Sequence, residues 1–194
     1  MIVDKYWQVT LVYERSDDGT AFGRPDYARP VRYMLCSTGD PNRAYGYETT
    51  SGKWATGIPK ARFYQFINLE AAQYLTLIHS RTFFQSVLYE RNRDPSTLLR
   101  SSYDALGTKA TGGSVVLTVP DSRWIFYHIG YGTTCEIRDG DPNDAETAAI
   151  RAQLVLPPSD PSETLQIGGA PWTDNWRIGD VPHELPYRYE PIPS

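Results

Sequence analysis

Residues 68–107, NLEAAQYLTLIHSRTFFQSVLYERNRDPSTLLRSSYDALG, decide the fold class because they hold the strongest helical signals in the chain. Asn68 can cap a helix that starts at Leu69, and the apolar positions that follow recur at helical spacing. Those positions are Leu69, Ala72, Leu75, Ile78, Phe84, Val87 and Leu88. Asp94-Pro95 then has the form of a second helix start, and Gly107 is a natural stop. We therefore expect helices in this stretch, with a break near Ser80 as an open alternative.

The segments on either side have the composition of strands. Residues 5–15 alternate between two faces, and Asp17-Asp18-Gly19-Thr20 follows as a turn. The other expected strands are 31–37, a weak hairpin over 44–56, a hairpin formed by 114–119 and 123–131, and 133–138. A last helix over 145–154 would be capped by Asp141, with Pro142 in its first turn. This order predicts an α+β fold in which an antiparallel sheet packs with two to four helices.

Eight of the fifteen prolines fall in residues 157–194. Proline removes a backbone donor and blocks the preceding helical turn, so this segment suits neither a regular helix nor a central strand. It still carries large aromatic side chains. We expect two parts, an α+β core over 1–156 and an extended arm over 157–194, with interaction anchors at Trp172, Trp176, Tyr187 and Tyr189.

The composition of the chain argues against some classes of binding partner. The net charge of −4 and the scattered basic residues argue against nucleic acid, which needs a clustered cationic surface. The chain contains no apolar run near twenty residues, which argues against membrane insertion. Its N-terminus lacks the basic start and apolar stretch of a signal peptide, so we expect a cytoplasmic or virion location. Protein subunits are the expected partners.

No metal or cofactor is expected. The acidic loop 139–146 could offer oxygen ligands to calcium, but it departs from the EF-hand pattern and is explained by a capped helix start. The histidines His79, His128 and His183 form no close pair, and zinc sites usually need one. His79 would lie on a helix and His128 on an aromatic strand. The glycine-rich segment 107–113 follows a helix instead of opening one, so it does not predict a phosphate site.

Nucleophilic chemistry has one set of candidates. Cys135 could pair with His128 if a turn brought the two side chains together, with Asp139 and Asp141 nearby. The simpler interpretation is that Cys36 and Cys135 are buried free thiols. The many aromatic residues could instead form a carbohydrate-binding surface. They are Tyr45, Tyr47, Trp54, Phe63, Tyr64, Phe66, Trp124, Phe126, Tyr127 and Tyr131.

The leading hypothesis is a non-enzymatic structural or interaction protein of a larger assembly, such as a virion shell, tail or connector component. In that hypothesis the arm contacts neighbouring subunits. The alternatives are a small hydrolase or transferase with the dispersed His128, Cys135, Asp139 and Asp141 site, and a carbohydrate-binding module.

Overall fold

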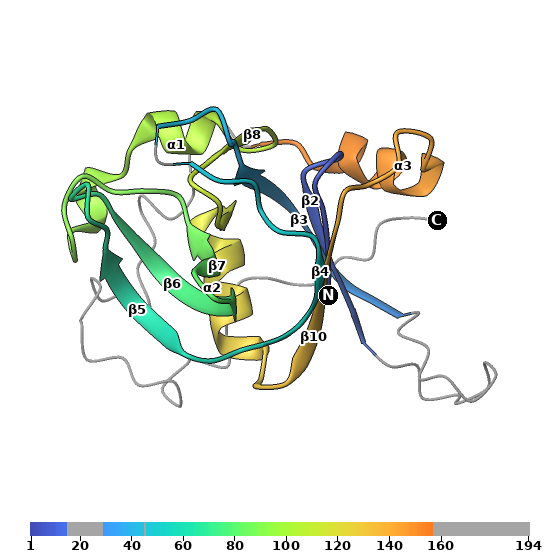
Figure 1. Ribbon diagram of the computed structural model, residues 1–194, viewed down its shortest axis with the longest axis horizontal. Helices are drawn as coiled ribbons and strands as arrows, with labels where there is room; N and C mark the ends of the chain where they lie inside the picture. Colours follow the sequence, from blue (N-terminus) through green and yellow to red (C-terminus); the bar gives the residue numbers. More distant parts are fainter. Residues whose placement is uncertain (15–28, 45, 157–194) are drawn as a thin grey trace.

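A curled sheet dominates the computed structural model, which describes residues 1–14, 29–44 and 46–156 (Figure 1). Nine of its ten strands form one continuous path in the order β4-β10-β1-β2-β3-β9-β7-β6-β5, and β8 pairs with β3. The strands are β1 (Ile2–Asp4), β2 (Val9–Glu14), β3 (Arg29–Gly39), β4 (Gly52–Thr56), β5 (Lys60–Gln65), β6 (Ala71–His79), β7 (Thr82–Ser86), β8 (Lys109–Thr111), β9 (Val115–Leu117) and β10 (Thr133–Arg138). The helical elements are η1 (Pro95–Thr97), α1 (Arg100–Asp104), α2 (Val119–His128) and α3 (Ala145–Gln153).

The expected fold class, an antiparallel sheet packed with two to four helices, is therefore wrong. The sheet is mixed, because β1 pairs in parallel with β10, and β7 in parallel with β9. The helices are few and short, and α2 alone lies along the middle of the sheet (Figure 1). None of the helices in the described ranges is long and apolar enough to cross a membrane.

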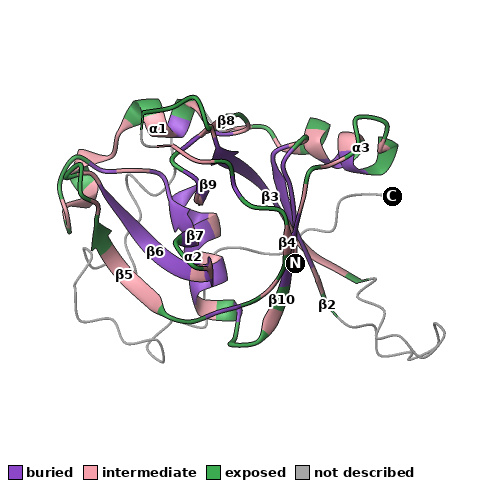
Figure 2. Ribbon diagram, in the orientation of Figure 1, coloured by how far each residue is buried: buried purple, intermediate pink, exposed green. Residues whose placement is uncertain are grey.

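The helix expected from Leu69 is two strands, β6 and β7. Every residue from Ala71 to Thr76 is buried, because both faces of β6 are covered (Figure 2). A strand that is buried on both faces is apolar along its length, so some of its apolar residues also fit a helical spacing. The second expected helix is interrupted. Asp94 caps only the short η1, where its Oδ1 accepts from the backbone N–H of Ser96 at 3.2 Å.

The hairpin expected over 114–119 and 123–131 is also wrong. Only β9 is a strand, and the rest forms α2. The Thr118 hydroxyl caps that helix by accepting from the N–H of Asp121 at 3.3 Å, and Pro120 fits the first turn because no donor is needed there. At the other end, Lys60 Nζ donates to the carbonyl of Ile129 at 2.7 Å. These end contacts fix α2 against the sheet.

Other segments agree with the sequence prediction. Strands occur at β2, β3 and β10, and a helix at α3. The cap of α3 is Asp144, not Asp141, since the Asp144 carboxylate accepts from the N–H of Thr147 at 3.0 Å. Among the described residues of 44–56 the weak hairpin does not form, because β4 pairs with β10 instead.

The core lies on both faces of the central strands. One cluster holds Cys36, Cys135, Phe84 and residues from β9 and α2. A second gathers tyrosines, among them Tyr74, Tyr89 and Tyr103. The proposed boundary at residue 156 is where the described part of the chain ends, so the structure does not test the arm as a separate part.

Candidate functional site

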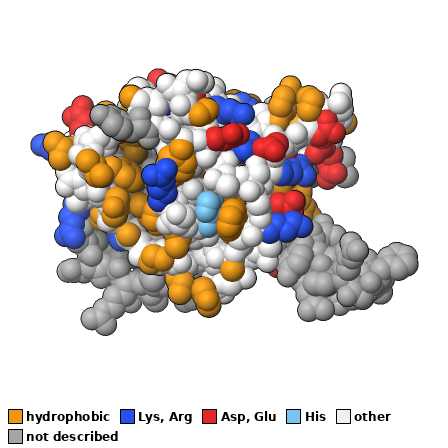
Figure 3. All heavy atoms as spheres, in the orientation of Figure 1, with side chains coloured by type: hydrophobic (Ala, Val, Ile, Leu, Met, Phe, Trp, Pro, Cys, Tyr) orange, Lys and Arg blue, Asp and Glu red, His pale blue; other side chains and the backbone are white. Residues whose placement is uncertain are grey.

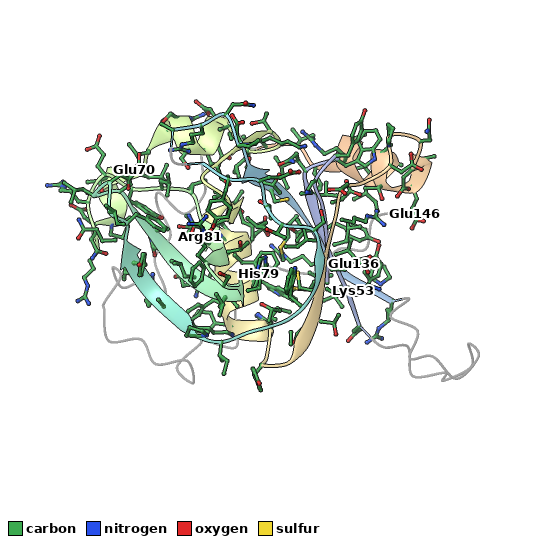
Figure 4. All side chains as sticks on the ribbon, in the orientation of Figure 1. Lys53, Glu70, His79, Arg81, Glu136 and Glu146 are labelled. Atoms are coloured by element: carbon green, nitrogen blue, oxygen red, sulfur yellow. The ribbon has the colours of Figure 1, made fainter. Side chains whose placement is uncertain are left out.

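The turn between β6 and β7 presents two basic side chains next to each other. His79 pairs with Thr82, which leaves Ser80 and Arg81 as a tight connection. Ser80 has φ of +49°, a left-handed conformation that is uncommon for residues other than glycine. Figure 4 shows His79 and Arg81 close together on the same side of the molecule. The hairpin geometry therefore fixes the spacing of an imidazole and a guanidinium.

His79 is held by an aromatic stack. Its ring lies on the indole of Trp54 in β4, with centroids 3.8 Å apart and an angle of 17° between the planes. The indole also lies against Gly52, where an added β-carbon would be 2.9 Å from Cζ2 of Trp54. The indole of Trp54 thus contacts Gly52 and stacks with the imidazole of His79. This arrangement leaves the imidazole little freedom to rotate.

Arg81 is held in a similar way by Tyr47. Its Cζ lies 4.2 Å from the centre of the Tyr47 ring, and the Tyr47 hydroxyl donates to the Arg81 carbonyl at 3.0 Å. The ring also occupies the space beside Gly113, where an added β-carbon would be 2.1 Å from Cζ of Tyr47. A cation–π contact and a hydrogen bond therefore place the same arginine.

Both aromatic rings come from one segment, residues 46–56, and buried contacts anchor it. Thr49 is fully buried, and its hydroxyl accepts from the N–H of Gly39 and donates to the carbonyl of Gly113, both at 2.8 Å. Lys5 Nζ donates to the Thr49 carbonyl at 3.0 Å. The platform under His79 and Arg81 is thus fixed to the sheet.

A serine hydroxyl lies directly after this platform. Ser114 follows Gly113 directly before β9 and is half-buried. Its Oγ accepts from the backbone N–H of Phe83 at 3.3 Å, and its carbonyl accepts from the Thr111 hydroxyl at 2.6 Å. The hydroxyl is therefore bound to the first part of β7, just after the turn. We call Tyr47, Trp54, His79, Arg81 and Ser114 together the turn site.

The two basic groups differ in charge state and exposure. Burial lowers the pKa of His79, so its imidazole is neutral at pH 7. The Arg81 guanidinium is permanently charged, and the residue is exposed. Figure 3 shows an imidazole in the middle of this face, among hydrophobic side chains and beside a basic one. The turn site therefore offers an apolar surface next to one oriented cation.

The dispersed site proposed from the sequence does not come together. His128 lies at the exposed end of α2, where its ring stacks on Trp124 and its Nδ1 is 2.8 Å from the Trp124 carbonyl. Cys135 is fully buried in the core. The predicted strand position of His128 and the predicted helix position of His79 are both wrong.

The acidic members of that set have structural partners. Asp139 accepts from Lys5 Nζ at 2.7 Å and from the Ser51 hydroxyl at 2.7 Å. Asp141 accepts from the backbone N–H of Asn143 at 2.8 Å. Across the residues that the structure describes, no three His, Cys, Asp or Glu side chains converge as metal ligands would.

Neither cysteine can act as a nucleophile in the folded chain. Cys36 and Cys135 are free thiols, and both are buried. Burial in apolar surroundings raises the pKa of each thiol to about 12. The thiolate is the reactive form, and it is scarce at neutral pH for both residues. The chain has only these two cysteines.

The predicted arm anchors, Trp172, Trp176, Tyr187 and Tyr189, lie outside the described residues and stay a prediction, as does Tyr45 among the candidate carbohydrate-binding aromatics. Most of the other aromatics are core or half-buried, and Tyr64 and Tyr131 are exposed. Sequence reasoning missed the turn site because it placed His79 on a helix. The available signal was the polar His79-Ser80-Arg81 between two β-rich runs, which favours a hairpin.

Comparison with known proteins gives a fold and no close relative. No protein-family model matches the chain, and no curated protein matches it. Among solved structures, an L,D-transpeptidase in complex with imipenem superposes with a TM-score of 0.52 and 16% sequence identity, covering 71% of this chain and 57% of that one. An L,D-transpeptidase from Mycobacterium smegmatis has a TM-score of 0.49 and 12% identity, covering 71% and 57% of the two chains.

A third similar structure is a fused Zn-dependent amidase/peptidase/peptidoglycan-binding domain-containing protein from Clostridium acetobutylicum. Its TM-score is 0.48 and its identity 17%, covering 71% of this chain and 50% of that one. This chain thus spans between half and three fifths of each of these solved structures. The fold is similar to that of an L,D-transpeptidase, and this contradicts the hypothesis of a non-enzymatic virion or assembly component, because that fold is one an enzyme uses.

Proposed function

We propose that this chain acts at bacterial peptidoglycan, where the turn site binds the peptide part of the polymer. The observation that carries the proposal is the similarity of the curled sheet to an L,D-transpeptidase, a type of enzyme that works on cell-wall peptides. The turn site supports it, because fixed aromatic rings beside one exposed cation suit a peptide with apolar and anionic groups.

Binding, and not thiol chemistry, is the activity that the described residues support. Moving an acyl group between amines through a covalent intermediate needs an activated nucleophile. Both thiols are buried and protonated at neutral pH, so a cysteine route is closed to this chain.

One observation favours a second candidate, acyl transfer through a serine. Ser114 lies directly before β9 and is only half-buried, beside the same platform that holds Arg81. A hydroxyl nucleophile would need a base to take its proton. His79 is neutral and could accept one, and Oγ of Ser114 accepts from the Phe83 N–H, so that hydrogen bond does not use the hydroxyl proton.

Co-sedimentation with purified peptidoglycan sacculi tests the proposal. We expect the wild-type chain to sediment, and the double variant His79→Gln with Arg81→Gln to sediment much less. Arg29→Gln is the matched control, because Arg29 is an exposed arginine that pairs with Glu14 on another part of the sheet. Equal sedimentation of the double variant, or none by the wild type, would overturn the proposal.

The same incubations decide between the two candidates. Soluble peptide products are measured by mass spectrometry after hours at pH 7.5. Products that the wild type forms and Ser114→Ala does not would assign serine-based transfer. Sedimentation without products would assign binding alone.

A further inference from the structure

We propose that Arg81 recognises a carboxylate on the bound peptide, and that the turn site therefore selects peptides by their negative charge. This inference rests on the proposed function and adds the chemical group that the site selects. It starts from how firmly Arg81 is oriented.

The orientation of Arg81 is determined before any ligand arrives. Its guanidinium lies over the Tyr47 ring, and the Tyr47 hydroxyl bonds the Arg81 carbonyl, not the guanidinium. The ring in turn is confined by Gly113. An arginine usually loses considerable side-chain freedom when it binds, and a guanidinium already placed on a ring loses less.

The donor groups of Arg81 remain available to a ligand. The contact with Tyr47 occupies the π-face of the guanidinium. The N–H groups lie in the guanidinium plane and point outward from its edge. The planar fork of N–H groups matches the two oxygens of a carboxylate, which gives a short, charge-assisted, bidentate pair. A neutral amide or a sugar hydroxyl can satisfy only part of that fork.

The acidic side chains of the surrounding elements have other partners. Glu48 and Asp139 bind Lys5, whose charged group lowers the pKa of both carboxyls. Glu70 accepts from the Asn68 side chain at 2.7 Å and lies 3.9 Å from the Arg43 guanidinium. These carboxylates are therefore bound to other groups, and the Arg81 N–H groups are left for a ligand anion.

The stacked rings of Trp54 and His79 form the apolar part of the turn site. The Trp54–His79 pair is flat and mostly apolar, and its imidazole carries no charge at neutral pH. A ligand carboxylate on Arg81 would place the adjacent part of the peptide against this surface. The site thus fits a peptide whose carboxylate is next to a small apolar residue.

Three synthetic peptides test the inference by calorimetry at pH 7.5 and low salt. They are acetyl-Lys-D-Ala-D-Ala with a free C-terminal carboxylate, the same peptide as its C-terminal amide, and acetyl-Glu-D-Ala-amide, which has a side-chain carboxylate only. We expect the free acid to bind about tenfold more tightly than the amide, because a charge-assisted pair is lost in the amide.

Variants assign that preference to Arg81. We expect Arg81→Gln to remove the tenfold preference and leave amide binding unchanged. Arg81→Lys should restore part of the preference, because it keeps the charge without the planar fork. Arg29→Gln should behave as wild type. Each variant is checked for an unchanged thermal unfolding midpoint, so that a loss of fold is not mistaken for a loss of recognition.

The outcomes separate the inference from the proposed function. The inference is overturned, and the proposed function left standing, by either of two results. One is equal binding of acid and amide by the wild type together with binding of acetyl-Glu-D-Ala-amide that Arg81→Gln does not weaken. The other is sacculus binding with no binding of any peptide. Absence of both peptide and sacculus binding overturns the proposed function itself. Binding of acetyl-Glu-D-Ala-amide that Arg81→Gln weakens supports carboxylate recognition with a side chain as the source.

Discussion

The turn between β6 and β7 and the buried part of β10 both carry groups that chemistry could use, yet they differ in what surrounds them. The turn holds His79 and Arg81 against the half-buried rings of a fixed platform, and Arg81 is exposed to solvent. Strand β10 places Cys135 in the core with no exposure to solvent. The difference teaches that the position of a residue in the fold, more than its intrinsic reactivity, decides whether it can meet a ligand.

The largest expected effect comes from breaking the platform at Gly113. This residue has φ of +125°, and an added β-carbon would overlap the Tyr47 ring. We expect Gly113→Ala to lower the free energy of unfolding by about 3 kcal/mol, from backbone strain and overpacking together. Urea unfolding measures the change, and peptide binding should fall with it.

Gly112→Ala is the control for that variant. No atom lies within 4 Å of a β-carbon added at Gly112, so we expect a change of about 0.5 kcal/mol or less. If the two variants lost the same stability, the clash with Tyr47 would not be what makes Gly113 necessary.

A smaller effect is expected in the core at Cys135. Replacing the thiol by a hydroxyl buries a more polar group in an apolar cluster, so Cys135→Ser should lower the free energy of unfolding by about 2 kcal/mol. Peptide binding at the turn site should stay at the wild-type level. In the native wild type, Ellman's reagent should label neither cysteine quickly, and both should react together on unfolding.

Rapid labelling of Cys135 in the native protein would contradict this assignment and reopen a thiol mechanism. That result would remove the contrast between the buried thiol and the exposed turn.

Local patterns predicted the parts of the fold in which one strong signal dominates. Strand β2 alternates, and β10 is short and β-branched at its start, so both were predictable. The helix α3 was predictable from its alanine-rich stretch, although Asp141 was taken as its cap. That error has a physical reason, since Asp141 and Asp144 are both suited to a cap, and only the chain path selects between them.

The central strands were not predictable in the same way. Strand β6 is buried on both faces by elements distant in sequence, and such a strand has no period-two alternation to distinguish it from a helix. Helix α2 was mispredicted for the opposite reason, because its sequence favours a strand. Its residues Trp124, Ile125, Phe126 and Tyr127 favour a strand, and tertiary packing with the cap at Thr118 overrides that preference.

The turn site was missed because of the first of these errors. The helical interpretation of 68–88, even with a break near Ser80 left open, predicted no hairpin there. It also predicted no contact of His79 with Trp54 or of Arg81 with Tyr47. Those contacts join residues 25 and 34 positions apart, as the numbering shows. A single sequence does not encode such pairings in any local pattern, so only the three-dimensional structure reveals them.

The smallest expected effect distinguishes the two histidines by pH. Burial lowers the pKa of His79 in the folded chain, so the unfolded chain takes up the proton more readily. The free energy of unfolding should therefore fall as the pH drops below about 6.5, the ordinary pKa of histidine. We expect His79→Gln to remove this part of the fall between pH 7.5 and 5.5, and His128→Gln, on the exposed end of α2, to leave it in place. Urea unfolding midpoints at the two pH values measure the difference.

The carboxyls of Glu48, Asp94, Asp139 and Asp144 do not obscure this difference. Their pKa values are lowered in the folded chain, so the stability that they contribute is lost only in more acidic solution. An unchanged pH dependence in His79→Gln would mean that the stack on Trp54 leaves the imidazole as open to water as His128, and the exposed turn would then be less rigid than its contacts indicate.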